Sequence, residues 1–138
     1  MLPLAITDVS LTCVNDSAIF YHVPAKLIIS VLQVEQGRIG KIIKNSNGTY
    51  DIGPMGVNSL WLPELKKRGI SEQAIQSDPC QNVRVGTWIL SKKLAARENL
   101  AQGIGDYNSR HAPFNQRYYE RIRINYTKVT LLLNDPSH

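Results

Sequence analysis

A glutamate occupies an apolar position of one predicted helix. Within residues 25–36, Ile28, Val31 and Leu32 follow the i, i+3, i+4 spacing of a single helix face, and the next position on that stripe is Glu35. Glu35 also falls in the last turn, where the negative end of the helix dipole disfavours an anion. Desolvation and the dipole both favour the protonated carboxyl, so we expect a raised pKa. Keeping the group ionised would then cost about 1.4 kcal/mol per pKa unit.

Two interpretations account for a carboxyl group at this position. In the structural one, Glu35 pairs with a buried arginine or caps a neighbouring helix. In the functional one, it is a general acid that stays neutral near pH 7 until it donates its proton. Glycoside cleavage needs such an acid, because the leaving sugar oxygen must be protonated as the bond breaks. Asp51 is the nearest candidate for a second acid, although its place between a turn and Gly53 favours a turn-forming or capping role.

The cysteines and histidines do not have the spacing of a metal site, so we expect neither a metal nor another cofactor. Cys13 and Cys80 are either two buried thiols or a disulfide. A disulfide would indicate an oxidising compartment.

The candidate acid needs helices to position it, and most of the chain is predicted to be helical. The first helix covers residues 8–22, with Asp8 or Ser10 as its N-cap. It ends before Pro24, because a residue that precedes proline avoids the helical region. The second helix starts after Pro24 and ends at Gly37, a typical C-terminal cap.

A turn-rich segment, residues 38–53, interrupts the helical pattern. Asn47 and Gly48 are typical of a two-residue hairpin turn, so we expect a small β-hairpin or an irregular loop between the second and third helices. Further helices are predicted over residues 59–67, 78–98, 100–107 and 115–126, followed by a short apolar tail at 129–133.

Length and composition favour one globular domain over residues 1–138. The chain is 43% hydrophobic and 20% charged, which argues against a disordered protein. Sixteen basic and eleven acidic residues give a net charge of +5, which favours anionic partners. No apolar run reaches the roughly 18 residues of a membrane-spanning helix, and no signal peptide is visible.

Four short segments of the sequence stand out in order along the chain. The first is Val34-Glu35-Gln36-Gly37, and the second is residues 50–59, continued by Trp61-Leu62-Pro63. The third is residues 78–83, followed by Gly86 and Trp88-Ile89-Leu90, and the fourth is Asp106-Tyr107-Asn108.

In this order and at this spacing, the segments resemble the SLT-type lytic transglycosylases of the lysozyme-like superfamily. The first is similar to the family's Glu-Ser motif, the second to its Gly-Leu-Met-Gln-Ile-Asn-Ser stretch and the fourth to its Ala-Tyr-Asn. The resemblance covers about residues 10–122, leaves 123–138 as a C-terminal extension, and is greatest to the specialised members that accompany conjugation, secretion and pilus machines.

The resemblance implies a mainly α, lysozyme-like fold and places the family's general acid at Glu35. It also implies a Cys13–Cys80 disulfide, because such members often bridge a cysteine before the first helix to the cysteine of the Asp-Pro-Cys segment. Three positions depart from the family pattern. Gln36 replaces the serine that helps to orient the acid, and Pro54 replaces a leucine. Gly56 stands where a glutamine contacts substrate.

The implied substrate is peptidoglycan, cleaved at the β-1,4 bond between N-acetylmuramic acid and N-acetylglucosamine with closure of a 1,6-anhydro ring. Glu35 would act first as acid and then as base on the muramoyl C6 hydroxyl, so no second carboxylate is required. If Asp51 faced Glu35 across the cleft, hydrolysis by water on the same fold would become plausible. Besides Glu35, the expected site residues, all substrate-binding, are Asp51, Gly53, Met55, Val57, Asn58, Tyr107 and Asn108.

The resemblance also implies a periplasmic location, with glycan strands as the partner. The protein would open the wall locally for a secretion, conjugation or pilus assembly. Scattered basic residues and a disulfide count against nucleic acid, and we expect a monomer without stable membrane insertion. Because Gly56 and Gln36 depart from the family, a wall-binding or scaffold protein with weak or no turnover stays an alternative.

Overall fold

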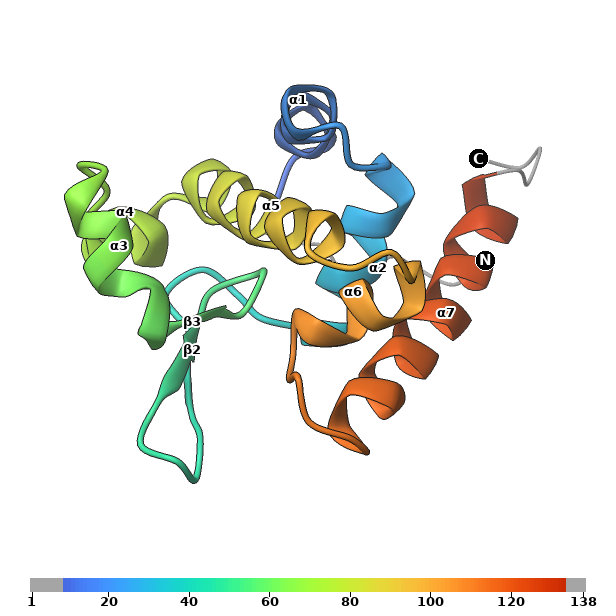
Figure 1. The fold of residues 1–138 in the computed structure, drawn as a ribbon. Helices are drawn as coiled ribbons and strands as arrows, with labels where there is room; N and C mark the ends of the chain where they lie inside the picture. The colour runs from blue at the N-terminus through green and yellow to red at the C-terminus, as the bar shows by residue number, and fades with distance from the viewer. Residues whose placement is uncertain (1–8, 134–138) are drawn as a thin grey trace.

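The computed structural model describes residues 9–133 and is mainly helical, as predicted. Its helices are α1 (Leu11–Tyr21), α2 (Ala25–Glu35), α3 (Leu62–Lys67), α4 (Glu72–Ser77), α5 (Pro79–Ala95), α6 (Leu100–Asp106) and α7 (Phe114–Leu133), with a 3-10 helix η1 (Ser59–Trp61). The strands are β1 (Ile42–Lys44), β2 (Tyr50–Ile52) and β3 (Val57–Asn58). Figure 1 shows α5 crossing the centre of the molecule, with α1 above it, α3 and α4 at one end and α7 at the other.

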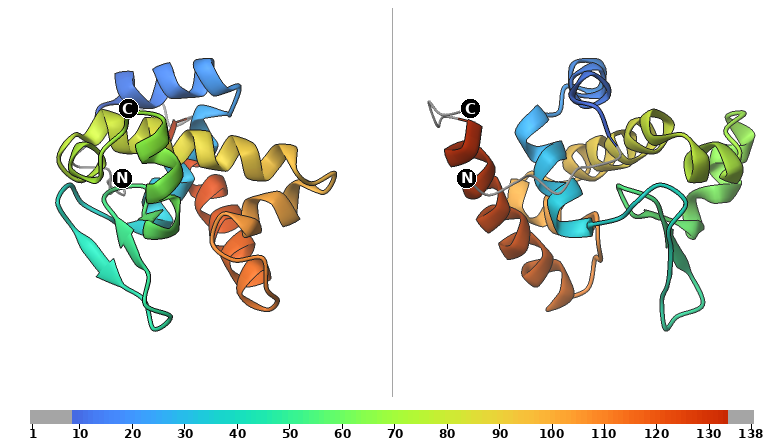
Figure 2. Two further views of the ribbon diagram at one scale, coloured as in Figure 1. Left: turned by 60° about the vertical axis from the view of Figure 1, so that its left-hand side comes forward. Right: turned by 180° about the vertical axis from the view of Figure 1, so that it is seen from behind.

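The three strands form the β element that was expected between the second and third helices. β1 pairs antiparallel with β2, and β2 pairs antiparallel with β3. Residues 45–49 connect β1 to β2, so the predicted two-residue turn at Asn47 and Gly48 is wrong. The Asn47 side chain accepts hydrogen bonds from the backbone N–H and the hydroxyl of Thr49, which stabilises the longer turn. Figure 2 shows this hairpin projecting from the helical part of the molecule.

The hydrophobic core forms around α2 and α5. Ile28, Val31 and Leu32 are buried, as the apolar stripe predicts. Helix α2 packs against α1 and α7, while α5 packs against α1, α4 and α6. Because neighbouring helices surround α2, Glu35, the next residue on its buried stripe, lies in an environment with little water.

The end of α2 is held close to the segment that follows β2. Gln36 adopts the left-handed conformation that ends the helix, with φ of 50°, one residue before the predicted cap at Gly37. Position 37 needs a glycine for a different reason: a Cβ there would collide with the carbonyl oxygen of Gly53. This close approach brings Glu35 next to the residues after β2.

The structure contains helix in two places where the sequence predicted none. The pattern predicts no helix where α4 lies, yet Ser71 caps it by accepting a hydrogen bond from the N–H of Ala74. The apolar tail at 129–133 is the last part of α7, because Val129 packs into the core with an exposed fraction of 1%. Helix α1 is capped by Ser10, one of the two predicted candidates, whereas Asp8 lies outside the described residues.

A disulfide joins Cys13 in α1 to Cys80 at the start of α5, with 5.3 Å between the Cα atoms, which confirms the predicted pairing. It ties two packed helices through cysteines that are 67 residues apart in the chain. Among residues 9–133, no helix has both the length and the hydrophobicity that a membrane span would need.

Candidate active site

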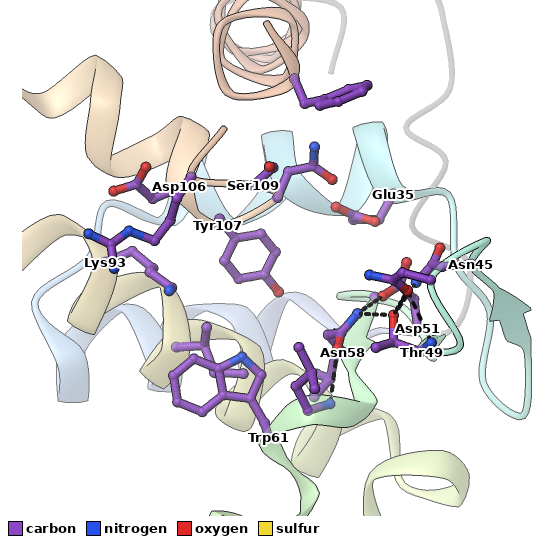
Figure 3. A pocket seen from close by; sticks show the side chains of 18 of the residues that line it. Glu35, Asn45, Thr49, Asp51, Asn58, Trp61, Lys93, Asp106, Tyr107 and Ser109 are labelled. Atoms are coloured by element: carbon purple, nitrogen blue, oxygen red, sulfur yellow. Dashed lines mark hydrogen bonds between the residues drawn. The ribbon is translucent and has the colours of Figure 1, made fainter. Parts of the chain in front are cut away.

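A cavity of about 450 Å³ lies between the sheet and the helices, and Glu35 lines it. Figure 3 shows Asp51 and Asn58 at one end of this cavity and Lys93 at the other, with Tyr107 between them. The end of α2, the three-stranded sheet, α5 and the loop after α6 all contribute side chains to it. The cavity is therefore built from segments that are far apart in the sequence.

Glu35 is the last residue of α2 and is largely buried. One of its carboxylate oxygens accepts a hydrogen bond of 2.7 Å from the hydroxyl of Tyr118. The pKa of Glu35 is raised from 4.5 to about 7, and burial is the largest cause. The Tyr118 hydrogen bond lowers the pKa, the negative charge of Asp51 raises it and the positive charge of Arg121 lowers it. The upward shift predicted from the helix pattern is confirmed, and such a group can both give and take a proton near neutral pH.

The structural interpretation of Glu35 does not match its surroundings. Within the described part of the chain, Glu35 belongs to none of the ion pairs. Arg121 influences it through charge alone and donates its own hydrogen bond to the carbonyl oxygen of Val34, at 3.3 Å. The hydrogen bond that Glu35 accepts comes from a tyrosine hydroxyl and not from the N-terminus of a helix.

Two tyrosines, the partly buried Tyr107 and the buried Tyr118, lie beside Glu35. The rings of Tyr107 and Tyr118 stack with centroids 6.2 Å apart and an interplanar angle of 27°. The Tyr107 hydroxyl donates to the carbonyl oxygen of Met55 at 2.7 Å and not to Glu35. Burial and the charge of Glu35 raise the pKa of both hydroxyls well above 10, so both keep their protons. Tyr107 therefore braces the wall, and Tyr118 holds the acid.

Sequence reasoning did not identify Tyr118. A signal for it existed, because Tyr118 lies three residues after Asn115 and four before Ile122 on the inner face of α7, and all three are buried. A hydroxyl on such a face needs a partner. The sequence alone does not indicate that the partner is 83 residues away.

Asp51 lies on β2 and faces the same cavity as Glu35. Asn58 donates from its amide nitrogen to Asp51 at 3.0 Å and to the Thr49 hydroxyl at 3.2 Å. Its amide oxygen caps η1 by accepting from the N–H of Leu60. The turn-forming or capping role favoured for Asp51 is therefore wrong, because Asp51 is a strand residue whose carboxylate takes part in a network at the end of the cavity.

Two of the predicted substrate-binding residues do not reach the cavity. Met55 has an exposed fraction of 0% and packs against Gly86, where a Cβ would collide with it. Gly53 is likewise buried, against the side chain of Asn82. The prediction that these two line the cleft is wrong, because the segment turns inward after β2. The buried amide of Asn82 fixes this turn by accepting from the N–H of Met55 and donating to the carbonyl of Ile52.

The other predicted residues, Asp51, Val57, Asn58, Tyr107 and Asn108, all line the same cavity as Glu35. Their contacts with substrate stay a prediction. Of the residues that depart from the family pattern, Gly56 also lines the cavity, whereas the exposed Gln36 and the buried Pro54 do not.

Gly56 lies directly against the acid. Its φ is 60°, a conformation that favours glycine, and a Cβ built there would be 2.5 Å from Oε1 of Glu35. No side chain therefore fits at position 56 while Glu35 keeps its observed position. The carboxylate of Glu35 occupies the space that a side chain at position 56 would need.

The far wall of the cavity carries positive charge. Lys93 places its Nζ 5.5 Å from the centre of the Trp61 ring, and both residues line the cavity. Within residues 9–133, no cluster of three or more His, Cys, Asp and Glu side chains is arranged to hold a metal ion.

Comparisons with known proteins place the chain in a family. The family described as "Transglycosylase SLT domain" matches residues 12–123, which include the Glu35 cavity. The chain is 33% identical over 148 residues to the peptidoglycan-binding-like protein of Escherichia coli O157:H7, covering 96% of this chain and 89% of that protein. It is 33% identical over 114 residues to the invasion protein IagB of Salmonella typhimurium (strain SL1344), covering 79% and 71%, respectively. It is 25% identical over 114 residues to the protein IpgF of Shigella flexneri, covering 79% and 75%.

The family match agrees with the resemblance carried by the four motif segments, and its limits differ by no more than two residues from the predicted 10–122. With a mainly α fold, a small sheet and a buried glutamate at the end of α2, the chain belongs to the transglycosylase SLT domain family and is a peptidoglycan lytic transglycosylase.

Proposed function

We propose that Glu35 performs both proton transfers when this protein cleaves the β-1,4 bond between N-acetylmuramic acid and N-acetylglucosamine. The observation that carries the proposal is a largely buried carboxyl group whose pKa is raised to about 7 in an open cavity. Such a group is protonated often enough to act as an acid and is basic enough to recover a proton.

The proposed reaction has two steps and consumes no water. Glu35 first donates its proton to the glycosidic oxygen as that bond to the muramoyl C1 breaks. The Glu35 carboxylate then takes the proton of the muramoyl C6 hydroxyl, whose oxygen bonds to C1 and closes the 1,6-anhydro ring. The proton gained in the second step replaces the one given in the first, so Glu35 ends as it began.

The surroundings of Glu35 support this double role. Tyr118 donates to one carboxylate oxygen and stabilises the anion that forms between the steps. The remaining carboxylate oxygen, Oε1, points toward Gly56, where no side chain shields it. We assign substrate contacts to Asp51, Val57, Asn58, Tyr107 and Asn108, which line the cavity around the acid.

A second reaction is favoured by one observation. Asp51 lines the same cavity, and its charge raises the pKa of Glu35. A second carboxylate near the acid is the arrangement with which glycosidases activate water or stabilise the sugar cation. Hydrolysis, with a reducing muramoyl end as product, is therefore the alternative to the anhydro product.

Mass spectrometry of the fragments released from purified peptidoglycan tests both proposals. We expect anhydro-muropeptides from the wild type and none from Glu35→Gln, with the folded state of both proteins checked by circular dichroism. Reducing ends that disappear in Asp51→Asn would instead support hydrolysis. Binding to peptidoglycan without fragments from any of the folded proteins would contradict both reactions and support a wall-binding or scaffold role.

We further propose that the protein acts in the periplasm and opens the wall for an assembly that crosses the envelope. Two findings support this: the family acts on peptidoglycan, and one similar protein is named as an invasion protein. Fractionation of a strain that expresses the native gene tests the location, and recovery in the cytoplasm would contradict it.

A further inference from the structure

The side of the cavity formed by α5 and the loop after α6 carries two positively charged side chains. Lys93 and Arg110 both line it, and neither is in an ion pair within the described residues. Asp106, the acidic residue on this side, already accepts hydrogen bonds from other side chains. Arg97 donates to both of its oxygens, at 2.7 and 3.2 Å, and Asn115 donates at 2.7 Å.

The lysine is held at the wall of the cavity. Its Nζ lies 5.5 Å from the Trp61 ring, within the range of a cation–π contact. Trp61 is itself fixed by an edge-to-face contact with Trp88, with centroids 5.5 Å apart. Figure 3 shows Lys93 beside Trp61 and far from Asp51, so the two ends of the cavity differ in charge.

We propose that Lys93 and Arg110 bind carboxylates of the substrate, namely those of the peptide stems on the muramoyl residues of the strand. The inference rests on the proposed function. The sugar backbone of peptidoglycan is uncharged, and the acidic groups belong to its stems. A strand with its scissile bond at Glu35 extends along the cavity, where the cations attract a stem carboxylate and the Asp51 end repels it. The enzyme therefore prefers strands that carry ionised stems and takes them in one orientation.

The test compares one glycan strand in two charge states. Soluble, uncrosslinked strands are used as isolated and after carbodiimide-mediated amidation of their carboxyl groups. The double variant Lys93→Gln/Arg110→Gln removes the two cations of the cavity. Lys67→Gln/Arg84→Gln is the matched control, because it removes the same net charge and both of its side chains are exposed outside the cavity.

For the wild type we expect a KM about five- to tenfold higher on the amidated strands, the size of two partly exposed ion pairs. This ratio should fall to about one in Lys93→Gln/Arg110→Gln and stay at the wild-type value in the control. A cavity variant that keeps the wild-type ratio would overturn the inference. Strands stripped by an amidase carry only the lactyl carboxylate. Because that carboxylate is part of an amide in intact strands, it cannot be the group bound there. No KM increase in the variant on stripped strands would support the assignment to the stem, and an increase as large as on intact strands would overturn it.

The inference and the proposed function fail in different ways. If the wild type released no fragments from any strand, the proposed function would fail. The carboxylate preference is then measured as a binding ratio in the Glu35→Gln background, with and without the Lys93 and Arg110 substitutions. A ratio unaffected by these substitutions would refute the inference there.

Discussion

The raised pKa of Glu35 makes the stability of the protein depend on pH in a way that one substitution removes. The folded state holds the Glu35 proton up to about pH 7, whereas the unfolded chain releases it near 4.5. Between these values the folded state binds more protons, so its stability relative to Glu35→Gln falls as the pH rises. The shift of about 2.5 units corresponds to about 3 kcal/mol.

The comparison is made by urea denaturation of wild type and Glu35→Gln at several pH values from 4 to 8.5, followed by circular dichroism with the disulfide intact. Every other titrating group is shared, so the difference between the two free energies of unfolding reports Glu35. We expect a constant difference below pH 4.5, a change of about 3 kcal/mol in favour of Glu35→Gln between pH 4.5 and 7, and a plateau above.

Glu98→Gln makes the same chemical change at an exposed position and calibrates the assay. A difference between wild type and Glu35→Gln that stays flat from pH 4 to 8.5 would refute the reasoning, because it would mean that folding does not favour the protonated carboxyl. A change of the opposite sign would mean that the anion is stabilised by the fold, and the assignment of Glu35 as an acid would lose its physical basis.

Three further predictions follow from the same contacts. Tyr118→Phe removes the hydrogen bond that lowers the pKa of Glu35, so the alkaline limb of the pH profile of kcat/KM should move to higher pH; an unmoved limb would mean that the bond does not act on the acid. Gly56→Ala places a Cβ against Oε1 of Glu35 in a backbone conformation with φ of 60°. It should destabilise the fold by about 1 kcal/mol and lower kcat by at least about tenfold, and wild-type turnover would show that the acid has room to move. Replacing both Cys13 and Cys80 by serine should lower the free energy of unfolding by about 4 kcal/mol in urea titrations, since the disulfide spans 67 residues; a loss below about 1 kcal/mol would mean that residual structure already restrains the unfolded chain without the disulfide.

Local patterns were enough to single out the candidate acid and to predict most of the helices that position it. The stripe of Ile28, Val31 and Leu32 places Glu35 on a buried face, because the period of a helix depends only on the chain itself. The same kind of evidence predicts the helices around it and the β element after α2. The motif segments add the pairing of Cys13 with Cys80, which composition alone leaves open.

Local patterns fail where a chain segment turns. The sequence predicts substrate contacts for four of the residues after β2, yet Gly53 and Met55 are buried away from the cavity, whereas Val57 and Asn58 line it. The amide of Asn82, which comes from α5, decides which way this segment turns. The end of α2 is similar, because Gly37 is needed for contact with Gly53 and not for its own dihedral angles.

The sequence by itself therefore determined which residue is the candidate acid, why its carboxyl is pushed toward neutrality, and that helices carry it. Only the tertiary structure decided how large the shift is and what the acid contacts. Tyr118 reaches Glu35 from 83 residues away, and Tyr107 reaches Met55 from 52 residues away. Such contacts arise when α7 and α6 pack against the rest of the fold, and helical periodicity, which relates neighbours within a few turns, carries no information about them.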